Sequence, residues 1–530
     1  MEATCAHCGF ANPPGFAFCG RCGTRFASAA LAPAELARLR AYLPAPLLDP
    51  LAVAAPPTEP LLTPCITHLA ALLDTSASLI PPYLLETVIR TPVPGRASGQ
   101  FVQGTLLFAD ISGFTNLSEL LSHSGREGAA QITAIINRCF STMLAILRDH
   151  DGQLVRFGGD ALLALFPGPE HPTLAVQAAM RMQAAMAEFA QTMTSQGPIA
   201  RSIKIAVRTG RCFAALLGSA HHMEYALLGA DGNALAAAEA VATRGMVVLD
   251  PATYAALTVP CRVVALTADY LAVQAIEAAR HVTPAAQQSI PQFQPTLVDL
   301  RRALDLLDAL VPLLPAGFLS RLVANPHALG VEGEHRLVAV LFAYVHGLGA
   351  IVDLLGPGNE AAIVATLNTY FTALDEAAQR FGGVINKIDL ATHGDRLVVI
   401  LGAPQAHEDD AERAVHVALA MHAALEPIHR TLPQTVGLTD LCVEQQIGVN
   451  YGYVFAGYVG TRWHHEYTVM GDEVNLAARL MGVAPSGAVT VSHAVRRRVQ
   501  SRFELVSRGE VHLKGGGAPL WSGGRPNGGS

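Results

Sequence analysis

The 530-residue chain lacks the features that mark membrane, secreted and nucleic-acid-coating proteins. No run of about 18 apolar residues is free of prolines and charges, so we expect no membrane span. No basic segment followed by an apolar core comes after Met1, so we expect no secretory signal. Charged residues make up only 15% of the chain, and the net charge of −7 argues against a surface that coats nucleic acid or an anionic membrane.

Cysteine is also scarce, with nine in the chain, and the nine do not form a disulfide framework. Four cluster near the amino terminus, and five are scattered: Cys65, Cys139, Cys212, Cys261 and Cys442. This usage predicts a reducing, cytoplasmic compartment. The hydrophobic content of 51% is ample for sizeable cores. A length of ~150 residues per domain predicts three or four domains.

What the chain does contain is a duplication. Three pairs of stretches recur in one order: LLFADISGF (Leu106–Phe114) with VLFAYVHGL (Val340–Leu348), FGGDALLALFPGP (Phe157–Pro169) with THGDRLVVILGAP (Thr392–Pro404), and EYALLGADGNALAAAEA (Glu224–Ala240) with EYTVMGDEVNLAARLM (Glu466–Met481). Their separations are nearly constant (344 − 110 = 234, 395 − 160 = 235 and 475 − 233 = 242). Such regularity predicts two copies of one module.

Around this repeat we expect six segments. They are a zinc ribbon at 1–26, a Pro/Ala-rich linker with short helices at 27–99, a first module at 100–275, a helical connector at 276–333, a second module at 334–522 and a disordered tail at 523–530. Within a module the pattern of strand, helix, hairpin, helix and strand predicts a ferredoxin-like α+β fold.

Two acidic residues stand out in the first module. Asp110 ends a hydrophobic strand, and Asp160 sits in the tight turn of the next hairpin. In this fold the two points lie on adjacent central strands, which places two carboxylates close together and suits Mg²⁺ or Mn²⁺ holding a polyphosphate. The helix expected after Gly113, at about Thr115, has free N–H groups that suit a terminal phosphate. The plainer alternative makes Asp110 a helix N-cap and Asp160 a turn residue.

The second module offers an amide and cations instead. Asn475 and Arg479 are four residues apart in a helical stretch and therefore share one face, which suits a ribose and a phosphate. Lys387 and Thr468 lie on expected strands, and Lys514 precedes a glycine run. The alternative is that Lys387 is a solvated strand end and Arg479 an exposed helix charge.

The two copies differ at these positions. Asp110 aligns with Tyr344, and Asn233 and Glu239 align with Asn475 and Arg479. Since one copy keeps the acids and the other the cations, the sequence predicts one composite site between two related halves.

The stretches FADISGF, GGDALLALF and YTVMGDEVNLAARLM together resemble class III nucleotidyl cyclases. The tandem arrangement is most similar to the bicarbonate-responsive soluble adenylyl cyclases and their bacterial relatives. The resemblance covers about 350 residues and implies two ferredoxin-like cyclase domains in a pseudo-twofold intramolecular pair. It also implies that ATP is converted to cyclic AMP and pyrophosphate.

The resemblance assigns roles to individual positions. It implies that Asp110 and Asp160, with the backbone carbonyl of Ile111, hold two Mg²⁺ or Mn²⁺ ions. It implies substrate contacts by Gly113, Phe114, Lys387, Thr468 and Asn475, and catalytic roles for Asn475 (ribose), Arg479 (pentavalent phosphate) and Lys514 (triphosphate). A lysine and a threonine donor suit adenine, so ATP is favoured over GTP. In the bicarbonate-responsive relatives the second site carries a lysine and an arginine. Here Arg156 and Ala236 stand near those positions, so one cation is missing.

Three alternatives stay open: an inactive or weak nucleotide-binding pseudo-cyclase, a guanylate cyclase, and a zinc-dependent nucleic-acid binder. The presence of the acidic, amide and cationic residues named above argues against a pseudo-cyclase. The net negative charge of the chain argues against a nucleic-acid binder. With both halves of the site in one chain, we expect a monomer.

The amino-terminal cysteines have the spacing Cys5-x2-Cys8, ten residues, Cys19-x2-Cys22, which predicts a zinc ribbon. A ribbon of this size depends on one structural Zn²⁺ for its folding. The alternative is four incidental or reactive thiols. Because the local charge is weak, we expect the ribbon to contact a protein or to serve structure rather than bind DNA.

Overall fold

The computed structural model describes residues 3–4, 7–12, 19–23, 30–54, 56–112, 125–189, 191–194, 197–200, 202–277, 290–315, 317–327, 333–391, 394–403, 405–436, 444–461, 464–513 and 516–526. The chain divides into two compact units. The first comprises Met1–Ala77, Glu86–Pro94 and Gln288–Leu329, and the second comprises Ser78–Leu85, Gly95–Gln287 and Gly330–Ser530. Both copies of the repeat belong to the second unit. Within the described part of the chain, no helix combines the length and apolar character that crossing a membrane requires.

The first unit is a small hairpin followed by helices. Its elements are β1 (Ala3–Thr4), β2 (Ala11–Asn12), α1 (Pro33–Leu39), α2 (Ala45–Val53), α3 (Glu59–Ala77), α10 (Leu297–Leu310), η2 (Val311–Leu313) and α11 (Phe318–Ala324); α4 (Pro82–Arg90) crosses the boundary between the units. Helix α3 is longer than the short helices that the prolines of this segment suggest. Pro60 falls in its first turn, where a proline costs no helical hydrogen bond, and the helix continues through Pro64 in its interior. It packs on α10, so the linker and the connector fold together.

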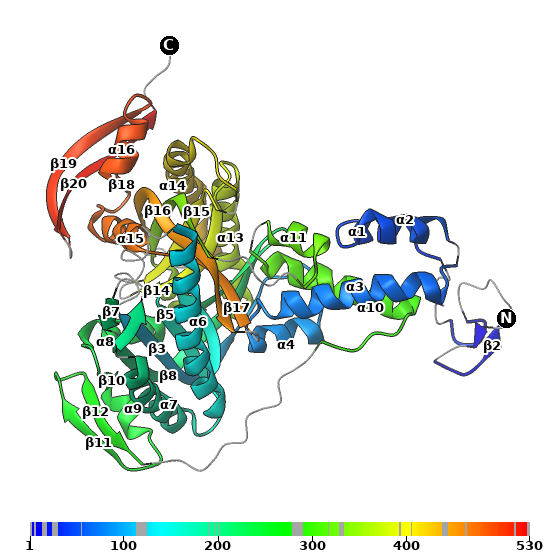
Figure 1. The fold of residues 1–530 in the computed structure, drawn as a ribbon, viewed down its shortest axis with the longest axis horizontal. Helices are drawn as coiled ribbons and strands as arrows, with labels where there is room; N and C mark the ends of the chain where they lie inside the picture. The colour runs from blue at the N-terminus through cyan, green and yellow to red at the C-terminus, as the bar shows by residue number, and fades with distance from the viewer. Residues whose placement is uncertain are drawn as a thin grey trace. The chain divides into compact units, whose positions relative to one another are not determined.

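The first module follows the expected order of strand, helix, hairpin, helix and strand (Figure 1). Its elements are β3 (Ser98–Ser112), α6 (Gly125–Asp149), β4 (Gln153–Gly158), β5 (Ala161–Phe166), α7 (His171–Met186), η1 (Ala187–Phe189), β6 (Gln191–Thr194), β7 (Gly197–Ala200), β8 (Ser202–Gly218), β9 (Met223–Leu228), α8 (Ala230–Val241), β10 (Val247–Leu249), α9 (Pro251–Ala255), β11 (Cys261–Ala265) and β12 (Leu271–Ile276). The helical segment of α7 and η1 ends at Phe189, and 191–194 pairs with 197–200 as a hairpin.

The second module repeats this plan. Its elements are β13 (Glu334–His346), α12 (Leu348–Leu355), α13 (Glu360–Gln379), β14 (Val384–Ala391), β15 (Gly394–Leu401), α14 (Asp410–Val436), β16 (Glu444–Thr461), β17 (His464–Met470), α15 (Asp472–Val483), β18 (Val489–Val491), α16 (His493–Val499), β19 (Phe503–Leu513) and β20 (Gly516–Pro526). The expectation of disorder from residue 523 is wrong as far as Pro526, because β20 pairs with β19 to that point.

The two sheets have the same strand order. The first runs β4-β5-β3-β8-β10-β12-β11 and the second β14-β15-β13-β16-β18-β20-β19. Strands β4-β5-β3-β8 and their counterparts form the ferredoxin-like antiparallel core. The predicted α+β fold with two such domains is therefore confirmed.

The modules join by exchanging hairpin arms. The β8–β9 arm places Phe213, Leu217 and Leu228 in the hydrophobic core of the second module. The β16–β17 arm places Phe455 and Met470 in the core of the first. Accordingly, β9 contacts β14, and β17 contacts β4. This reciprocal exchange brings the hairpin that carries Asp160 next to the arm that leads to Asn475.

Candidate active site between the two modules

The two acidic residues of the first module lie at one edge of its sheet. Asp110 is near the end of β3 and opposes Ala161 of β5. Asp160 occupies the turn between β4 and β5, where Gly159 has a φ of 74° that a residue without a side chain adopts freely. The backbone N–H of Ile111 donates to the carbonyl of Asp160 at 3.1 Å. This hydrogen bond fixes the two acid-bearing segments side by side.

The carboxylates interact electrostatically. Burial, and then the negative charge of Asp110, raise the pKa of Asp160 to about 7, while the ammonium groups of Lys387 and Lys204 act against this rise. Two neighbouring carboxylates repel each other when both are ionised, and a hard divalent cation bound between them relieves this repulsion. The chemistry of Asp110 and Asp160 thus fits the metal ions that their sequence positions imply.

Lys204 is a member of the site that the sequence motifs did not reveal. It opposes Asp110 in the β3–β8 register, and its Nζ lies 3.4 Å from Asp110 Oδ2. It also forms an ion pair with Glu239 of α8. One signal was available, since Lys204 interrupts the apolar strand SIKIAV with a charge. Its two acidic partners, however, come from distant parts of the chain.

The side chains of Lys387 and Thr468 lie on the second module and are buried. Lys387, on β14, is 7% exposed, and its Nζ donates to the carbonyl of Phe157 at 3.1 Å. Thr468, on β17, is fully buried, and among the described residues its hydroxyl has no hydrogen-bond partner. Asn386 Nδ2 donates to the Tyr467 carbonyl at 3.3 Å and ties the two strands together. A buried hydroxyl without a protein partner fits a position that contacts a ligand.

Asn475 and Arg479 lie four residues apart on α15, as the sequence predicts, and both side chains are half-buried. The helix begins directly after Gly471, the residue that follows Met470 of β17. A Cβ placed on Gly159 would lie 3.9 Å from Met470 Cγ, in ordinary van der Waals contact. The acidic turn of the first module therefore adjoins the start of the helix that carries Asn475 and Arg479.

Three of the residues predicted for the nucleotide site fall outside the described part of the chain: Gly113, Phe114 and Lys514. Their contributions remain predictions.

Comparison with known proteins identifies the family. The profile of the adenylate and guanylate cyclase catalytic domain matches residues 97–278 and again 331–522, which together make up more than half of the chain. The chain belongs to this cyclase family. The resemblance noted in the sequence is thereby confirmed for both modules.

Individual relatives agree with this assignment. The chain is 24% identical over 425 residues to adenylate cyclase type 10 of Homo sapiens, covering 75% of the chain but only 25% of that relative. It is 28% identical over 208 residues to an adenylate cyclase of Mycobacterium tuberculosis, covering 39% of the chain and 43% of that protein. A class III adenylyl cyclase-like ATP-binding protein from Pseudomonas aeruginosa shares the fold of both modules, with a TM-score of 0.53 at 16% identity over 76% of the chain and 85% of that structure.

The cyclase pair also has a second, pseudo-symmetric set of positions, in which the roles of the modules are reversed. Tyr344 occupies the place of Asp110, since each opposes the residue after the hairpin aspartate. Asp395 occupies the place of Asp160. It is 1% exposed, neither carboxylate oxygen has a hydrogen-bond partner among the described residues, and burial raises its pKa to about 7, with a smaller contribution from Asp353.

The alignment of Glu239 with Arg479 is wrong by two residues. Helices α8 and α15 both begin directly after a glycine, Gly229 and Gly471, and this shared register pairs Arg479 with Ala237. The separation of 242 residues between Asn233 and Asn475 gives the same pairing, so the sequence itself supports Ala237 rather than Glu239. With either residue, the second set of positions lacks an arginine there.

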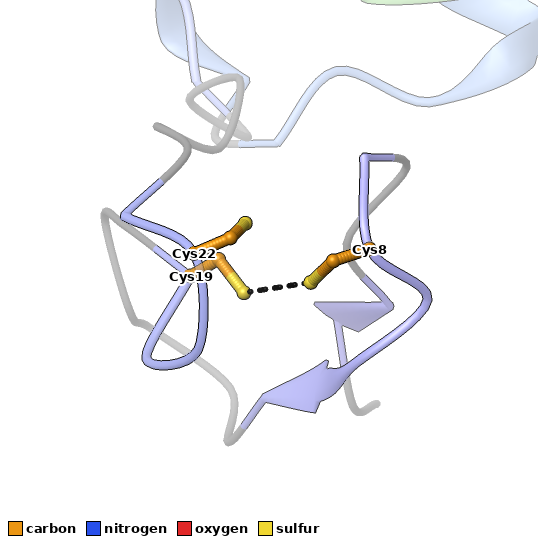
Figure 2. Close-up of side chains that lie close together, drawn as sticks. All are labelled: Cys8, Cys19 and Cys22. Carbon is orange, nitrogen blue, oxygen red and sulfur yellow. Dashed lines mark hydrogen bonds between the residues drawn. The ribbon is translucent and has the colours of Figure 1, made fainter.

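Three of the four amino-terminal cysteines form a cluster in the first unit (Figure 2). The sulfur atoms of Cys8, Cys19 and Cys22 all lie within 4.8 Å of one another, whereas Cys5 lies outside the described residues. Gly9 and Gly23 each follow a cysteine with a φ of 70°, as tight turns require. Burial acts to raise the pKa of the Cys19 thiol, but N–H groups of Cys22 and Arg21 outweigh it and lower the pKa to about 6, which favours the thiolate that metals bind.

Proposed function

We propose that the chain is an adenylate cyclase that converts ATP to 3′,5′-cyclic AMP and pyrophosphate at one composite site between its two modules. One observation carries the proposal: the buried Lys387 and Thr468 of the second module lie next to the hairpin of the first module that holds Asp160. Lys387 reaches across the boundary to Phe157, three residues before that aspartate. A base-binding pair and an acidic pair therefore meet in one place.

The reaction is an intramolecular substitution at phosphorus. The ribose 3′-oxygen forms a bond to the α-phosphorus, the bond from that phosphorus to the oxygen of the β-phosphate breaks, and the hydroxyl proton leaves to solvent. Asp110 and Asp160 would hold divalent cations, which supply Lewis-acid stabilisation of the attacking and leaving oxygens when bound. The contribution of the protein is positioning and charge.

The remaining residues orient the nucleotide. The Asn475 amide hydrogen-bonds the ribose, and the fixed guanidinium of Arg479 stabilises the negative charge that develops on the phosphate. The ammonium of Lys204 lies beside Asp110. When a divalent cation neutralises Asp110, this ammonium would be suited to bind a polyphosphate oxygen instead. Lys514, the triphosphate lysine that the resemblance implies, is the other candidate for binding a polyphosphate oxygen.

Adenine is the base that the buried pair fits. Its N1 accepts a hydrogen bond, and both the Lys387 ammonium and the Thr468 hydroxyl can donate. Guanine has a donor at N1, which an ammonium cannot satisfy. Burial makes this difference large, because a mismatched donor would be left without a partner.

One structural Zn²⁺ in the ribbon belongs to the same proposal. The close sulfur atoms of Cys8, Cys19 and Cys22 leave one tetrahedral position, which the spacing of Cys5 suits. Because the hairpin arms complete the site within one chain, the proposal requires no dimer.

Incubating the purified chain with ATP or GTP, each with Mn²⁺, and separating the products by chromatography tests the proposal. Cyclic AMP should form in preference to cyclic GMP. Cyclic GMP as the main product would make the protein a guanylate cyclase. Nucleotide binding without a cyclic product at micromolar enzyme would make it a pseudo-cyclase.

A further inference from the structure

Arg156 stands at the position in the first module that Lys387 occupies in the second. Arg156 opposes Leu163, three residues after Asp160, and Lys387 opposes Val398, three residues after Asp395. Both follow a register shift in the strand that carries them. The two cations are therefore counterparts under the pseudo-twofold relation between the modules.

These two cations make reciprocal contacts. Arg156 Nη1 donates to the carbonyl of Ile388 at 2.6 Å, and Ile388 directly follows Lys387. Lys387 Nζ donates to the carbonyl of Phe157 at 3.1 Å, and Phe157 directly follows Arg156. Each cation thus fixes the backbone beside the other, and both are buried, at 8% and 7% exposure.

Arg156 also has partners within its own module. Nη2 donates to the carbonyl of Tyr225 on β9, and Glu224 provides a compensating carboxylate at 3.6 Å. Its position has no threonine counterpart either, because Ala226 stands where the second module has Thr468. The arginine is therefore committed to the protein backbone and is not arranged to receive a base.

The hairpin strand β4 also supports the other half of the base subsite. The backbone N–H of Phe157 donates to Glu466 Oε2 at 2.7 Å, and Glu466 lies two residues before Thr468 on β17. The pair Arg156–Phe157 consequently contacts both strands that carry the proposed base-binding side chains.

We infer that Arg156 is a positioning residue for adenine recognition, which holds β14 against the first module so that the Lys387 ammonium faces the base. This inference rests on the proposed function, since it concerns the same site. A guanidinium is suited to the role, because its planar fork donates to two carbonyls in a fixed geometry, whereas a lysine ammonium is a point charge on a flexible stem. Without the hydrogen bond from Arg156 to Ile388, β14 loses one charged contact with the first module, and the Lys387 side chain is held less firmly in its orientation.

Calorimetric binding of 3′-deoxy-ATP and 3′-deoxy-GTP with Mg²⁺ tests the inference, because nucleotides without a 3′-hydroxyl bind but cannot cyclise. Arg156→Ala should weaken binding of 3′-deoxy-ATP about tenfold, as expected for loss of a charged hydrogen bond. Binding of 3′-deoxy-GTP should change much less, so the preference for adenine falls. Arg156→Lys keeps the charge beside Glu224 and should lose about threefold.

Asn368→Ala is the matched control. Its side-chain oxygen accepts from Gly218 N at 2.6 Å and so also ties the modules together, but away from Lys387. This variant should keep the wild-type ratio of the two affinities. An equal loss of adenine preference in Asn368→Ala would mean that general loosening of the module boundary is responsible, and would overturn the inference.

A folded Arg156→Ala or Arg156→Lys variant with an unchanged ratio would also overturn it. If Arg156→Ala does not fold, Arg156→Lys alone decides. A wild-type chain that binds 3′-deoxy-ATP but forms no cyclic product from ATP would remove the proposed function and leave this inference standing. A chain that binds neither deoxynucleotide would remove both.

Discussion

Lys387 donates a hydrogen bond from its ammonium to the backbone carbonyl of Phe157, 230 residues earlier in the chain. Phe157 precedes the hairpin turn of Asp160, so this contact joins the strand that carries Lys387 in one module to the acidic turn of the other. It also explains why the ammonium of Lys387 opposes the rise in the pKa of Asp160. The proposed base-binding and metal-binding side chains are therefore linked through one short stretch of β4.

The two hairpin aspartates provide a matched test of which half is active. Asp160→Asn should abolish cyclic AMP formation, because it removes a metal-binding carboxylate. Asp395→Asn should keep turnover within about twofold, since Tyr344 already replaces the partner acid there. Product formation is measured for both variants, and circular dichroism confirms that each is folded. If Asp395→Asn were inactive and Asp160→Asn active, the two sites would be assigned the wrong way round.

The Asp395 variant should also change the dependence of stability on pH. Burial raises the folded-state pKa of Asp395 to about 7, whereas the unfolded chain releases this proton near pH 4, so the wild type loses stability as the pH rises from about 4 to 7. The stability advantage of Asp395→Asn over the wild type should therefore grow between pH 5 and pH 8, by on the order of 3 kcal/mol. Thermal unfolding at the two pH values measures this difference. Equal stability of the two proteins at pH 8 would contradict the burial of the Asp395 carboxylate.

Metal affinity should depend on pH for the same physical reason. The pKa of Asp160 is about 7 without a cation, so binding Mn²⁺ requires loss of a proton below that pH. The Kd for Mn²⁺ should fall about tenfold per pH unit as the pH rises toward 7, and then level off. Titration calorimetry from pH 5.5 to 8.5 gives the profile, with Asp395→Asn as the control that keeps it. A flat profile would exclude Asp160 as the titrating ligand.

The sequence was sufficient to predict features set by local pattern. The hairpin that places Asp160, the strand that carries Lys387 and the helix that pairs Asn475 with Arg479 all follow from short-range periodicity and turn residues. The role of Lys204 could not be predicted in this way, because its partners Asp110 and Glu239 lie on separate elements. The same holds for Arg156, whose contact with Ile388 exists only when the modules meet.

Arg479 should act on the chemical step rather than on binding. A guanidinium that stabilises developing phosphate charge is worth most in the transition state, so Arg479→Ala should lower kcat by about 100-fold with little change in KM. Arg497→Ala, which removes an exposed arginine of α16, is the control and should leave both constants unchanged. Initial rates over a range of ATP concentrations separate the two effects. A raised KM at constant kcat would instead place Arg479 in ground-state binding.

Exchanging the base-contacting pair should shift substrate preference. Lys387→Glu combined with Thr468→Cys replaces donors with an acceptor and a smaller polar group, which fits the N1–H and amino donors of guanine. The double variant should lose most activity toward ATP and gain relative activity toward GTP, measured as the ratio of the two kcat/KM values. If the ratio does not change, then neither residue contacts the base. Loss of all activity would be checked by 3′-deoxy-GTP binding, which should persist in a folded variant.

The cysteine cluster should hold one zinc ion per chain, and the thiols of the first unit differ in their capacity to bind it. N–H donation lowers the pKa of Cys19 to about 6, so its thiolate is available at neutral pH. Burial raises the pKa of Cys65, on α3, to about 11, so that thiol stays protonated. Cys19→Ser should therefore release the zinc detected by elemental analysis, while Cys65→Ser retains it. Because the cyclase modules have their own hydrophobic cores, cyclic AMP formation should survive the Cys19 change, and its loss would mean that the ribbon takes part in catalysis.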